Sequence, residues 1–513
     1  MLKGKKMLAV LLSAVLLIAM LPAAAFADAD TLTITDPYAA VDWNAVSAYK
    51  TGLHSHTNAS DGDQTLRQSL QRHLEAGFDI VAISDHGTVN YSWSEPNPDP
   101  LIHGFLHAIG RNEGELDYLG TEGVFENGTA YTVETDAYGD DYLIADGRRI
   151  LRVPFAIEQN AVSVNAHVNS WFTDYHDNSV TIYEDAVRGV DSHGGVCVIN
   201  HPGEYTKARY ELHSADAYNP ANPAYRYYIN KYATLIDRYD ACIGIDMNSK
   251  GDNRTRFDRI LWDTLLTRFS AGGGTVLGIA SSDAHQLSVI DTGFTLLLMP
   301  ELSSAAMREA LENGRFFAAS HCLGNYEELC EIAAALKAFY GENETYRSVS
   351  AAADEMAERI EGIETGRYDA DESIGATWSS LDGDGRFAAA SFPQVHGITV
   401  DDAENTVSFD AENALIVRMI SNGRQIAVQP AQGAVFDLDD CADALGDYVR
   451  FEIFGEGGMV YTQAYLLNAA ERRAEGKTPV TDGLYLNLGF LDFLFAEFHK
   501  LFAVLRRSFA ARL

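Results

Sequence analysis

Between Lys50 and Pro300 the sequence alternates short apolar runs with amphipathic stretches, and no other feature constrains the fold as strongly. The apolar runs have the length of strands and are Ile80–Ser84, Ile150–Ile157, Val196–Asn200, Ile243–Asp246 and Val276–Ser281. The stretches between them space their apolar residues as helices do, and they include Thr65–Ala76, Tyr183–His193 and Phe257–Phe269. Because strands that alternate with helices form βα units, this part of the chain predicts an α/β fold with a parallel sheet or barrel.

Histidines and carboxylates recur where these predicted strands end. In such folds, reactive side chains gather at the carboxyl ends of the strands, so we expect them to converge. Imidazole and carboxylate groups together are the ligands of multi-metal hydrolytic sites. The candidate metal ligands, which are also the candidate catalytic residues, are His54, His56, Asp61, His86, Glu158, His167, His201, Asp283 and His285.

The spacing within this set favours a metal site. His54 and His56 stand two residues apart, so on a strand both imidazoles face the same side and one metal can bind both. Asp61 adds a carboxylate on a tight turn shortly afterwards. Glu158 closes an apolar run, where an unpaired carboxylate is costly, and we therefore expect it to bridge two metals. Asp85 is better placed to orient an imidazole than to bind a metal itself.

Residues for binding a substrate phosphate are less well defined. The candidates are Lys250, Arg254 and Arg256, which follow the run that ends at Asp246, and a solvated loop is the alternative for each. The remaining histidines do not fit the strand-end pattern and are expected at the surface or in packing. They are His73, His103, His107, His176, His193, His213, His321, His396 and His499.

The motifs resemble those of the PHP superfamily, named after polymerase and histidinol phosphatase domains. The segment His54–Gly62 is similar to the family's His-x-His-Thr-x-x-Ser-Asp-Gly, and Ser84-Asp85-His86 is similar to its Thr-Asp-His. The remaining ligand positions of the family are matched in order by Glu158, His167, His201-Pro202 and Asp283-Ala284-His285. The resemblance covers roughly residues 50–320.

This resemblance implies a distorted (β/α)7 barrel with a trinuclear metal site. One metal would be held by His54, His56, Glu158 and Asp283, a second by Glu158, His167 and His201, and a third by Asp61, His86 and His285. Two or three divalent transition metals, Zn, Mn or Fe, would activate a bridging hydroxide and hold the phosphoryl oxygens. The implied activity is hydrolysis of a phosphoester bond in a small phosphorylated substrate, which could be a phosphomonoester, a nucleotide or an oligonucleotide end.

Two other functions stay open on the sequence. The chain could be a secreted, surface-associated binding protein that retains the barrel as a scaffold, or a metal-dependent hydrolase of a bond other than a phosphoester. No nucleophile elbow, phosphate-binding P-loop or dinucleotide fingerprint competes with the metal motifs.

The sequence also predicts a secreted protein built of several parts. Residues 1–27 have the lysines, apolar stretch and small-x-small cleavage signal of a secretory signal peptide, with an uncleaved membrane anchor as the alternative. We expect residues 28–320 to form the metal-dependent phosphoesterase domain, with residues 93–147 as an insertion. The insertion either lies over the mouth of the site or is a surface excursion without a role. We then expect a helical segment and linker at 321–385, a β-sandwich-like domain at 386–470 and a C-terminal amphipathic helix at 471–513.

The charge of the chain limits the classes of partner that we expect, and its cysteine content limits the disulfides. The formal charge is −35, and it becomes −38 when Lys3, Lys5 and Lys6 of the signal peptide are removed. Extended nucleic-acid binding needs clustered Lys and Arg and is therefore disfavoured. We expect residues 484–513 to form an aromatic amphipathic helix with a basic end. Peripheral membrane or cell-envelope contact, and docking onto the preceding domain or onto another copy of the chain, both stay open for it. Five cysteines do not make a disulfide scaffold, and pairing of Cys322 with Cys330 is left open.

Overall fold

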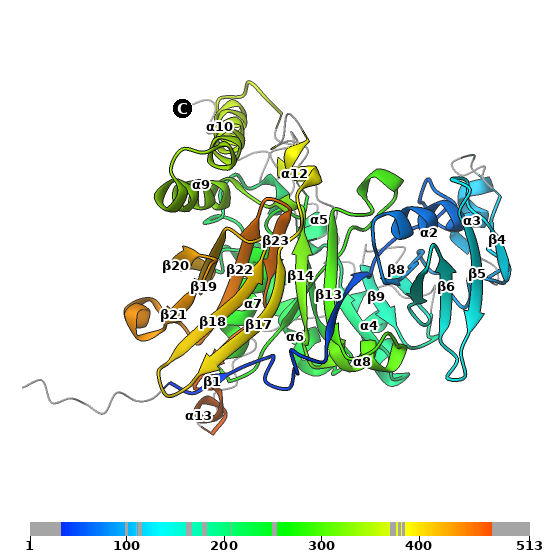
Figure 1. Ribbon diagram of the computed structural model, residues 1–513, viewed down its shortest axis with the longest axis horizontal. Coiled ribbons are helices and arrows are strands. Elements are labelled where there is room, and N and C mark those ends of the chain that lie inside the picture. Colours follow the sequence, from blue (N-terminus) through cyan, green and yellow to red (C-terminus); the bar gives the residue numbers. More distant parts are fainter. Residues whose placement is uncertain are drawn as a thin grey trace, which may run out of the picture.

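The structure is a computed structural model, and it describes residues 32–97, 101–108, 110, 115–160, 167–176, 182–206, 208–248, 254–369, 376–377, 381 and 385–474. It is a mixed α/β protein, as the alternation of strands and helices predicts (Figure 1). The predicted signal peptide, the helix predicted at 484–513, Lys250 and His499 lie outside the described residues. Among the described residues, no helix is long and apolar enough to cross a membrane.

Fourteen strands form one sheet that includes segments from both ends of the described chain. Its path is β1-β24-β22-β23-β14-β13-β2-β3-β7-β6-β5-β4, and β19 and β20 join it beside β22. In that order, the bounds are Ile34–Thr35, Tyr465–Leu467, Tyr448–Gly455, Gly458–Tyr461, Phe316–Ser320, Gly293–Met299, Ser47–Gly52, Ile80–Val81, Arg148–Arg152, Asp141–Ala145, Ala130–Thr135, Glu122–Val124, Ile416–Ser421 and Arg424–Pro430.

A second sheet has five strands in the order β12-β11-β10-β9-β8. Their bounds are Leu277–Ala280, Cys242–Asn248, Val196–Ile199, His167–Trp171 and Ile157–Asn160. β10, β11 and β12 run parallel, as expected for βα units, whereas β9 runs antiparallel to both of its neighbours. The strands therefore do not form one continuous parallel ladder, and the (β/α)7 barrel that the family resemblance implies stays a prediction.

The two sheets meet at the carboxyl ends of β2 and β3. Beyond β2, Ser55 makes an isolated parallel bridge with Ala284, which follows β12. Beyond β3, His86 makes another with Glu158 in β8. The first bridge is reinforced by a hydrogen bond of 2.9 Å from His56 N to Ala284 O. Strand ends from both sheets are thereby drawn together at one place.

The predicted run Ile150–Ile157 is two strands rather than one. β7 ends at Arg152 and β8 begins at Ile157. Between them, Pro154 has no backbone N–H to donate to a sheet, and Phe155 takes a left-handed φ of 54°. Glu158 is consequently the second residue of β8, not the residue that follows a strand.

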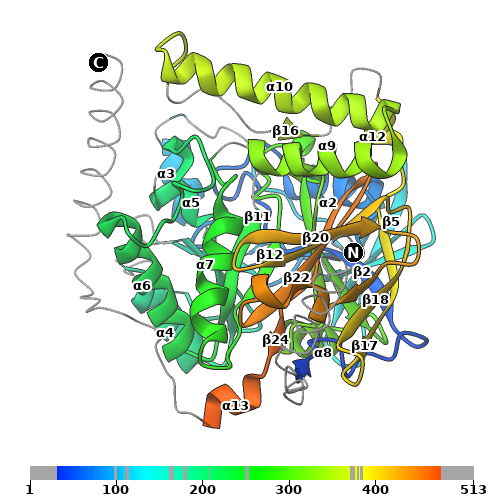
Figure 2. The ribbon, with the colours of Figure 1, turned by 90° about the vertical axis from the view of Figure 1, so that its left-hand side faces the viewer.

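Helices pack against the strands of the second sheet (Figure 2). The predicted helices are present as α2 (Leu66–Glu75), α4 (Tyr183–Ser192) and α7 (Asp258–Ser270). Thr65 and Gln68 close the first turn of α2 with a capping box, which explains why this helix begins where it does. The other helices and 3-10 turns between residues 202 and 312 are α5 (Pro202–Thr206), η1 (Ala208–Tyr210), α6 (Pro223–Arg238), η2 (Leu287–Val289) and α8 (Ser304–Glu312).

Residues 93–147 contribute α3 (Leu101–Ala108) and the strands β4, β5 and β6. β4 and β5 pair antiparallel and form a hairpin around Asn127-Gly128, where Gly128 takes the left-handed φ of 89° that such a turn favours. β6 pairs with β7, so this segment extends the large sheet at its edge. It also contacts the loop after His56, because Asn58 Nδ2 donates to Glu115 O at 2.9 Å.

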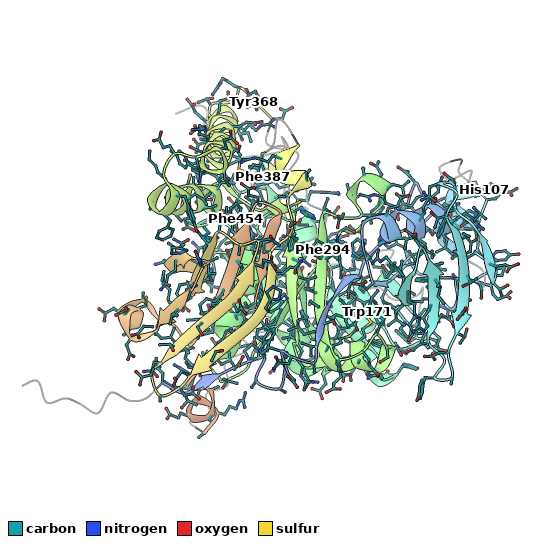
Figure 3. All side chains as sticks on the ribbon, viewed as in Figure 1. His107, Trp171, Phe294, Tyr368, Phe387 and Phe454 are labelled. Carbon is teal, nitrogen blue, oxygen red and sulfur yellow. The ribbon has the colours of Figure 1, made fainter. Side chains whose placement is uncertain are left out.

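The C-terminal part begins with α9 (Tyr326–Tyr340) and α10 (Glu344–Glu364), which lie side by side (Figure 2). A three-stranded sheet then faces β19 and β22 across a shared apolar core that includes Phe409 and Phe451. Figure 3 shows side chains filling both halves of the molecule, with the buried Trp171 in one and Phe454 in the other. The remaining elements are β15 (Cys322–Leu323), β16 (Ala376–Thr377), α12 (Arg386–Ala389), β17 (Gln394–Asp401), β18 (Thr406–Glu412), β21 (Val435–Asp437), η3 (Asp439–Ala444) and α13 (Ala469–Ala474).

Two strand pairs tie this part to the rest of the chain. β23 pairs with β14 across Ala318 and Tyr461, and β1 pairs with β24. Hydrogen bonds of one sheet therefore cross the expected boundary after residue 320. No disulfide joins any two of the five cysteines, all of which lie in the described residues, so Cys322 and Cys330 are not paired.

Candidate metal centre

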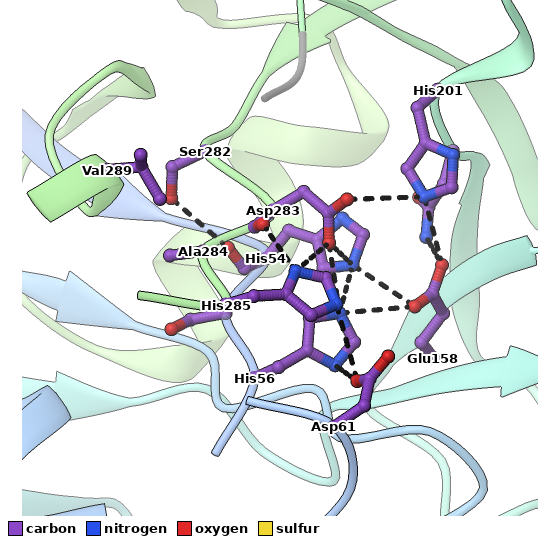
Figure 4. Close-up of polar contacts among 12 residues, drawn as sticks. His54, His56, Asp61, Glu158, His201, Ser282, Asp283, Ala284, His285 and Val289 are labelled. Carbon is purple, nitrogen blue, oxygen red and sulfur yellow. Dashed lines mark hydrogen bonds and ion pairs between the residues drawn. The ribbon is translucent and has the colours of Figure 1, made fainter. Parts of the chain in front are cut away.

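All nine side chains singled out in the sequence lie in one cluster at the junction of the two sheets. Figure 4 labels all of them except His86 and His167. They form three overlapping groups, and within each group the potential ligand atoms lie within 4.8 Å of one another. The groups are His56, Asp61, His86 and His285; His54, Glu158, His201 and Asp283; and His86, Glu158 and His167. Each group has the composition and size of a site for one cation.

Glu158 lies at the centre of the cluster and is fully buried. Its Oε2 lies 3.3 Å from Nε2 of both His54 and His56. Its other oxygen, Oε1, lies 2.9 Å from His167 Nδ1 and 3.4 Å from His201 Nε2. The two carboxylate oxygens thus face two different sets of imidazoles, which is the arrangement that a bridging ligand requires.

Asp283 lies opposite Glu158 across the same imidazoles. Its Oδ1 is 3.1 Å from His54 Nε2 and 3.0 Å from His56 Nε2, and its Oδ2 is 3.6 Å from His201 Nε2. The side chain is almost fully buried, so its charge needs compensation from cations.

Asp61 marks the open side of the cluster, since 42% of its side chain is exposed. Its Oδ1 lies 3.3 Å from His285 Nε2 and 3.5 Å from His86 Nε2. About a third of the His285 side chain (32%) is also exposed. A substrate would therefore reach the cluster most directly from the side of Asp61 and His285.

The geometry differs from the implied grouping at three histidines. His56 faces Asp283 through Nε2 and lies 3.7 Å from Asp61 through Nδ1. It therefore stands between the ligands implied for the first metal and those implied for the third. His86 places Nδ1 3.0 Å from Glu158 and Nε2 toward Asp61. It therefore stands between the ligands implied for the second metal and those implied for the third. His201 approaches both Glu158 and Asp283. The set of nine is compact enough that these three could serve either neighbour.

The imidazole nitrogens fit cations better than they fit hydrogen bonds. Nδ1 of His54, His86 and His167 is buried and makes no hydrogen bond to any described residue. This holds for His86 and His167 even though each nitrogen lies about 3 Å from a Glu158 oxygen. Buried polar atoms that face one another without a shared proton are costly. A cation between them would offset that cost, so the residues fit a multi-metal centre.

Burial and neighbouring charges within the cluster shift the pKa values of its side chains. Burial alone would raise the pKa of Glu158, but His167, His86 and His54 outweigh it and hold that pKa well below its usual range. Burial lowers the pKa of His54 to about 4. For His86, burial acts in the same direction, yet the charge of Glu158 outweighs it and raises the pKa to about 9. Glu158 is therefore held as a carboxylate and His54 as a neutral ligand.

Two of the nine residues sit on strained backbone. His201 has a φ of 25° and Asp283 a φ of 45°, both in the left-handed region that favours glycine. Such conformations cost about 1–3 kcal/mol each and cluster at functional sites. Each turns its side chain off the end of a strand, β10 for His201 and β12 for Asp283, into the cluster.

Asp85 supports the cluster through the loop after His56 rather than by contacting an imidazole directly. Its carboxylate accepts hydrogen bonds of 2.7 Å from Thr57 N, Thr57 Oγ1 and Ser60 Oγ. Ser60 Oγ in turn lies 3.3 Å from His56 Nδ1. Asp85 can therefore orient the imidazole of His56 through Ser60, as expected for an orienting residue.

Sequence reasoning missed three residues beside the cluster. Asn200 Nδ2 donates to Glu158 Oε1 at 2.7 Å. Asp246 is fully buried near the carboxyl end of β11 and accepts a hydrogen bond from the hydroxyl of Ser281. Tyr205 packs its ring 5.0 Å from that of His167. Asp246 could have been found, because it closes an apolar run as Glu158 does.

The three candidate phosphate-binding residues differ in where they lie and in what they contact. Arg254 Nη1 pairs with Glu204 Oε1 at 2.8 Å, and the other oxygen of Glu204 lies 3.6 Å from His201 Nδ1, so Arg254 is held near the cluster. Arg256 is wrong as a phosphate ligand: it is buried and its guanidinium donates to the backbone oxygen of Glu211. Lys250 lies outside the described residues.

Histidines outside the strand-end pattern do not join the three groups in the part of the chain that is described. His73 is a buried residue of α2, with Nδ1 2.8 Å from Ser69 O. His176 and His193 are exposed. His103 Nδ1 lies 2.6 Å from Asn58 O, so it ties α3 to the loop after His56.

No protein-family profile and no curated protein matches the sequence. Among solved structures, the chain is similar to PsfC from Pseudomonas syringae PB-5123, with 12% identity, a TM-score of 0.28, and coverage of 50% of this chain and 84% of that one. It is also similar to a two-domain protein from Bacteroides vulgatus ATCC 8482 that contains a predicted PHP-like metal-dependent phosphoesterase. That match has 13% identity, a TM-score of 0.30, and coverage of 85% and 98%. At these TM-scores the likeness establishes neither a shared fold nor a shared activity.

Proposed function

We propose that this protein is a secreted, metal-dependent hydrolase of the PHP type that cleaves phosphoester bonds. The observation that carries the proposal is the fully buried Glu158, whose two oxygens face different sets of imidazoles within a cluster of nine potential ligands. The order and spacing of the PHP-like motifs along the chain support the same reaction class.

When bound, two or three divalent cations would supply Lewis acidity and lower the pKa of a water at the site. The residues of the chain provide what such chemistry needs. Glu158 and Asp283 would offset the cationic charge from opposite sides, and the buried imidazole of His54, whose pKa is lowered to about 4, is a neutral ligand. Asp61 and His285 lie at the exposed side and would meet the reacting group of the substrate first.

Substrate binding rests on fewer residues. Among the described residues, Arg254 is the remaining cationic candidate for the phosphate, because it stands beside His201 through Glu204. The segment 93–147 contacts the loop after His56 and is placed to influence which substrates enter. A small phosphorylated molecule suits this single cationic contact better than an extended nucleic acid does.

Metal content and phosphate release test the proposal together. The chain from residue 28 onward would be purified, its metals quantified by mass spectrometry, and its activity measured on a panel of phosphomonoesters and phosphodiesters. Asp283→Asn should lose both bound metal and activity, whereas Asp63→Asn, an exposed carboxylate close to Asp61, should keep both. Equal phosphate release by Asp283→Asn and the wild type, or a wild type without transition metal, would overturn the proposal. Bound metal without phosphoester hydrolysis would point to another bond.

A further inference from the structure

A separate cavity of about 920 Å³ lies between α7, α9 and the strands β19, β20 and β22, of which α7, α9, β20 and β22 are labelled in Figure 2. None of the nine candidate metal ligands lines it. Its volume is within the range of small-molecule binding sites. Its position, where the α/β half meets the C-terminal strands, is also one where such sites are common.

The inner wall of the cavity is a network of buried ion pairs. Arg450 donates to both oxygens of Asp263, at 2.8 and 2.6 Å, and to Glu452 at 2.7 Å. Arg418 also binds Glu452, and Arg259 binds Glu328. These six residues are at most 5% exposed. Burying so many charges is costly, and apolar residues of similar volume would often be as stable or more so. The network therefore calls for a role beyond stability.

The lining carries no excess of either charge. Five arginines are matched by five carboxylates, which are Asp263, Glu327, Glu328, Glu331 and Glu452. A charged ligand that bound Arg259, Arg418 or Arg450, or a carboxylate paired with one of them, would have to displace a partner and leave the other group uncompensated. An anion would in addition approach a chain whose formal charge is −35. Anions are thus disfavoured on both counts, and cations on the first.

A neutral, hydroxyl-rich ligand can bind without breaking these pairs. A guanidinium has five N–H donors and a carboxylate has about four lone-pair sites, so a salt-bridged pair keeps unused capacity on both sides. Hydroxyl groups both donate and accept, and they can use that capacity. Hydroxyl and amide side chains complete the wall, namely Ser214, Asn219, Thr264, Thr267, Asn422 and Gln425. We propose that this cavity binds a mono- or disaccharide.

The test measures sugar binding separately from hydrolysis. The chain from residue 28 onward, carrying Asp283→Asn, would be titrated with glucose, galactose, N-acetylglucosamine, maltose and lactose. Inorganic phosphate and glycine serve as charged probes. Binding would be followed by isothermal titration calorimetry and saturation-transfer NMR. We expect at least one sugar to bind in this background, because no candidate metal ligand lines the cavity.

A pair of variants locates the binding. Ala215→Trp places a large side chain in the wall of the cavity and should weaken sugar binding by about tenfold or more. Ala221→Trp changes an equally exposed alanine that does not line the cavity and should leave binding unchanged. The proposal is overturned if no sugar binds, if Ala215→Trp binds the sugar as well as Ala221→Trp does, or if phosphate or glycine binds in place of the sugars.

Discussion

Asp85 offers the sharpest test of how the fold holds the metal centre. It is almost fully buried and accepts three hydrogen bonds of 2.7 Å from Thr57 and Ser60. A hydrogen bond to a charged group contributes about 1.5–3 kcal/mol. The three do not add fully, because Gly62 N also holds this loop through Thr57 O at 3.0 Å. For Asp85→Ala we expect the free energy of unfolding to fall by about 2–4 kcal/mol.

The effect on metal binding should be selective. The loop that Asp85 holds carries Asp61, whose carboxylate belongs to the exposed group with His285. Glu158 is positioned by β8 instead and does not depend on this loop. Residues that support metal ligands typically contribute a factor of about 10–100 in affinity, which is about 1.4–2.8 kcal/mol. Asp85→Ala should therefore lose one cation readily and retain those bound at Glu158.

The assay is metal content per chain during titration with a chelator, combined with urea unfolding. Asp79→Ala is the matched control, because this carboxylate precedes β3 at its opposite end and accepts a hydrogen bond from Lys50 N at 3.0 Å. It should reduce stability without changing metal content. If Asp85→Ala and Asp79→Ala hold the same cations with the same affinity, the loop does not position the exposed group and the reasoning fails.

Three further changes test the site and its scaffold. Glu158→Gln should reduce phosphoesterase activity by about 100-fold or more and lower metal content, measured by kinetics and mass spectrometry. Arg254→Ala should raise KM about tenfold with little change in kcat, and an unchanged KM would remove Arg254 from substrate binding. Burial raises the pKa of Glu452, but Arg418 and Arg450 outweigh it and hold that pKa at about 2, against 4.5 when unperturbed. Its ionised form therefore stabilises the fold above about pH 4.5, by roughly 3 kcal/mol, and this is lost as pH falls toward 2. In urea unfolding, Glu452→Gln should be less stable at neutral pH and less sensitive to acid, and a variant as acid-sensitive as the wild type contradicts this.

Local periodicity made much of the fold predictable. α2, α4 and α7 begin and end within one residue of the segments expected from helical spacing. The nine clustered residues could be found because each is a histidine or carboxylate close to an apolar run, and topology rather than sequence distance brings such positions together. The break between β7 and β8 had a local signal in Pro154, since proline cannot donate within a sheet.

Other features of the structure could not be predicted from the neighbouring sequence. The antiparallel direction of β9 depends on how the chain returns after Glu158, and residues 161–166 between the two strands lie outside the described residues. Arg256 shows the limit for single side chains: its position after β11 resembles that of Arg254, yet one points into the protein and the other pairs with Glu204. Residue type at a strand end indicates chemistry, whereas the direction of a long side chain depends on packing that the sequence does not display.

The C-terminal strands belong to the scaffold of the candidate site. β23 pairs with β14, β14 with β13, and β13 with β2, whose end leads directly into His54 and His56. A chain that stops at residue 320 would leave the edge of β14 unpaired, and an unpaired edge invites association with other chains. The segment 28–320 should therefore be less stable than the segment 28–474 and prone to aggregate, as measured by thermal unfolding and light scattering. If it instead unfolded cooperatively at the temperature of the longer chain and held the same metals, the C-terminal strands would be a separate module. The continuous ladder from β23 to β2 argues that they are not.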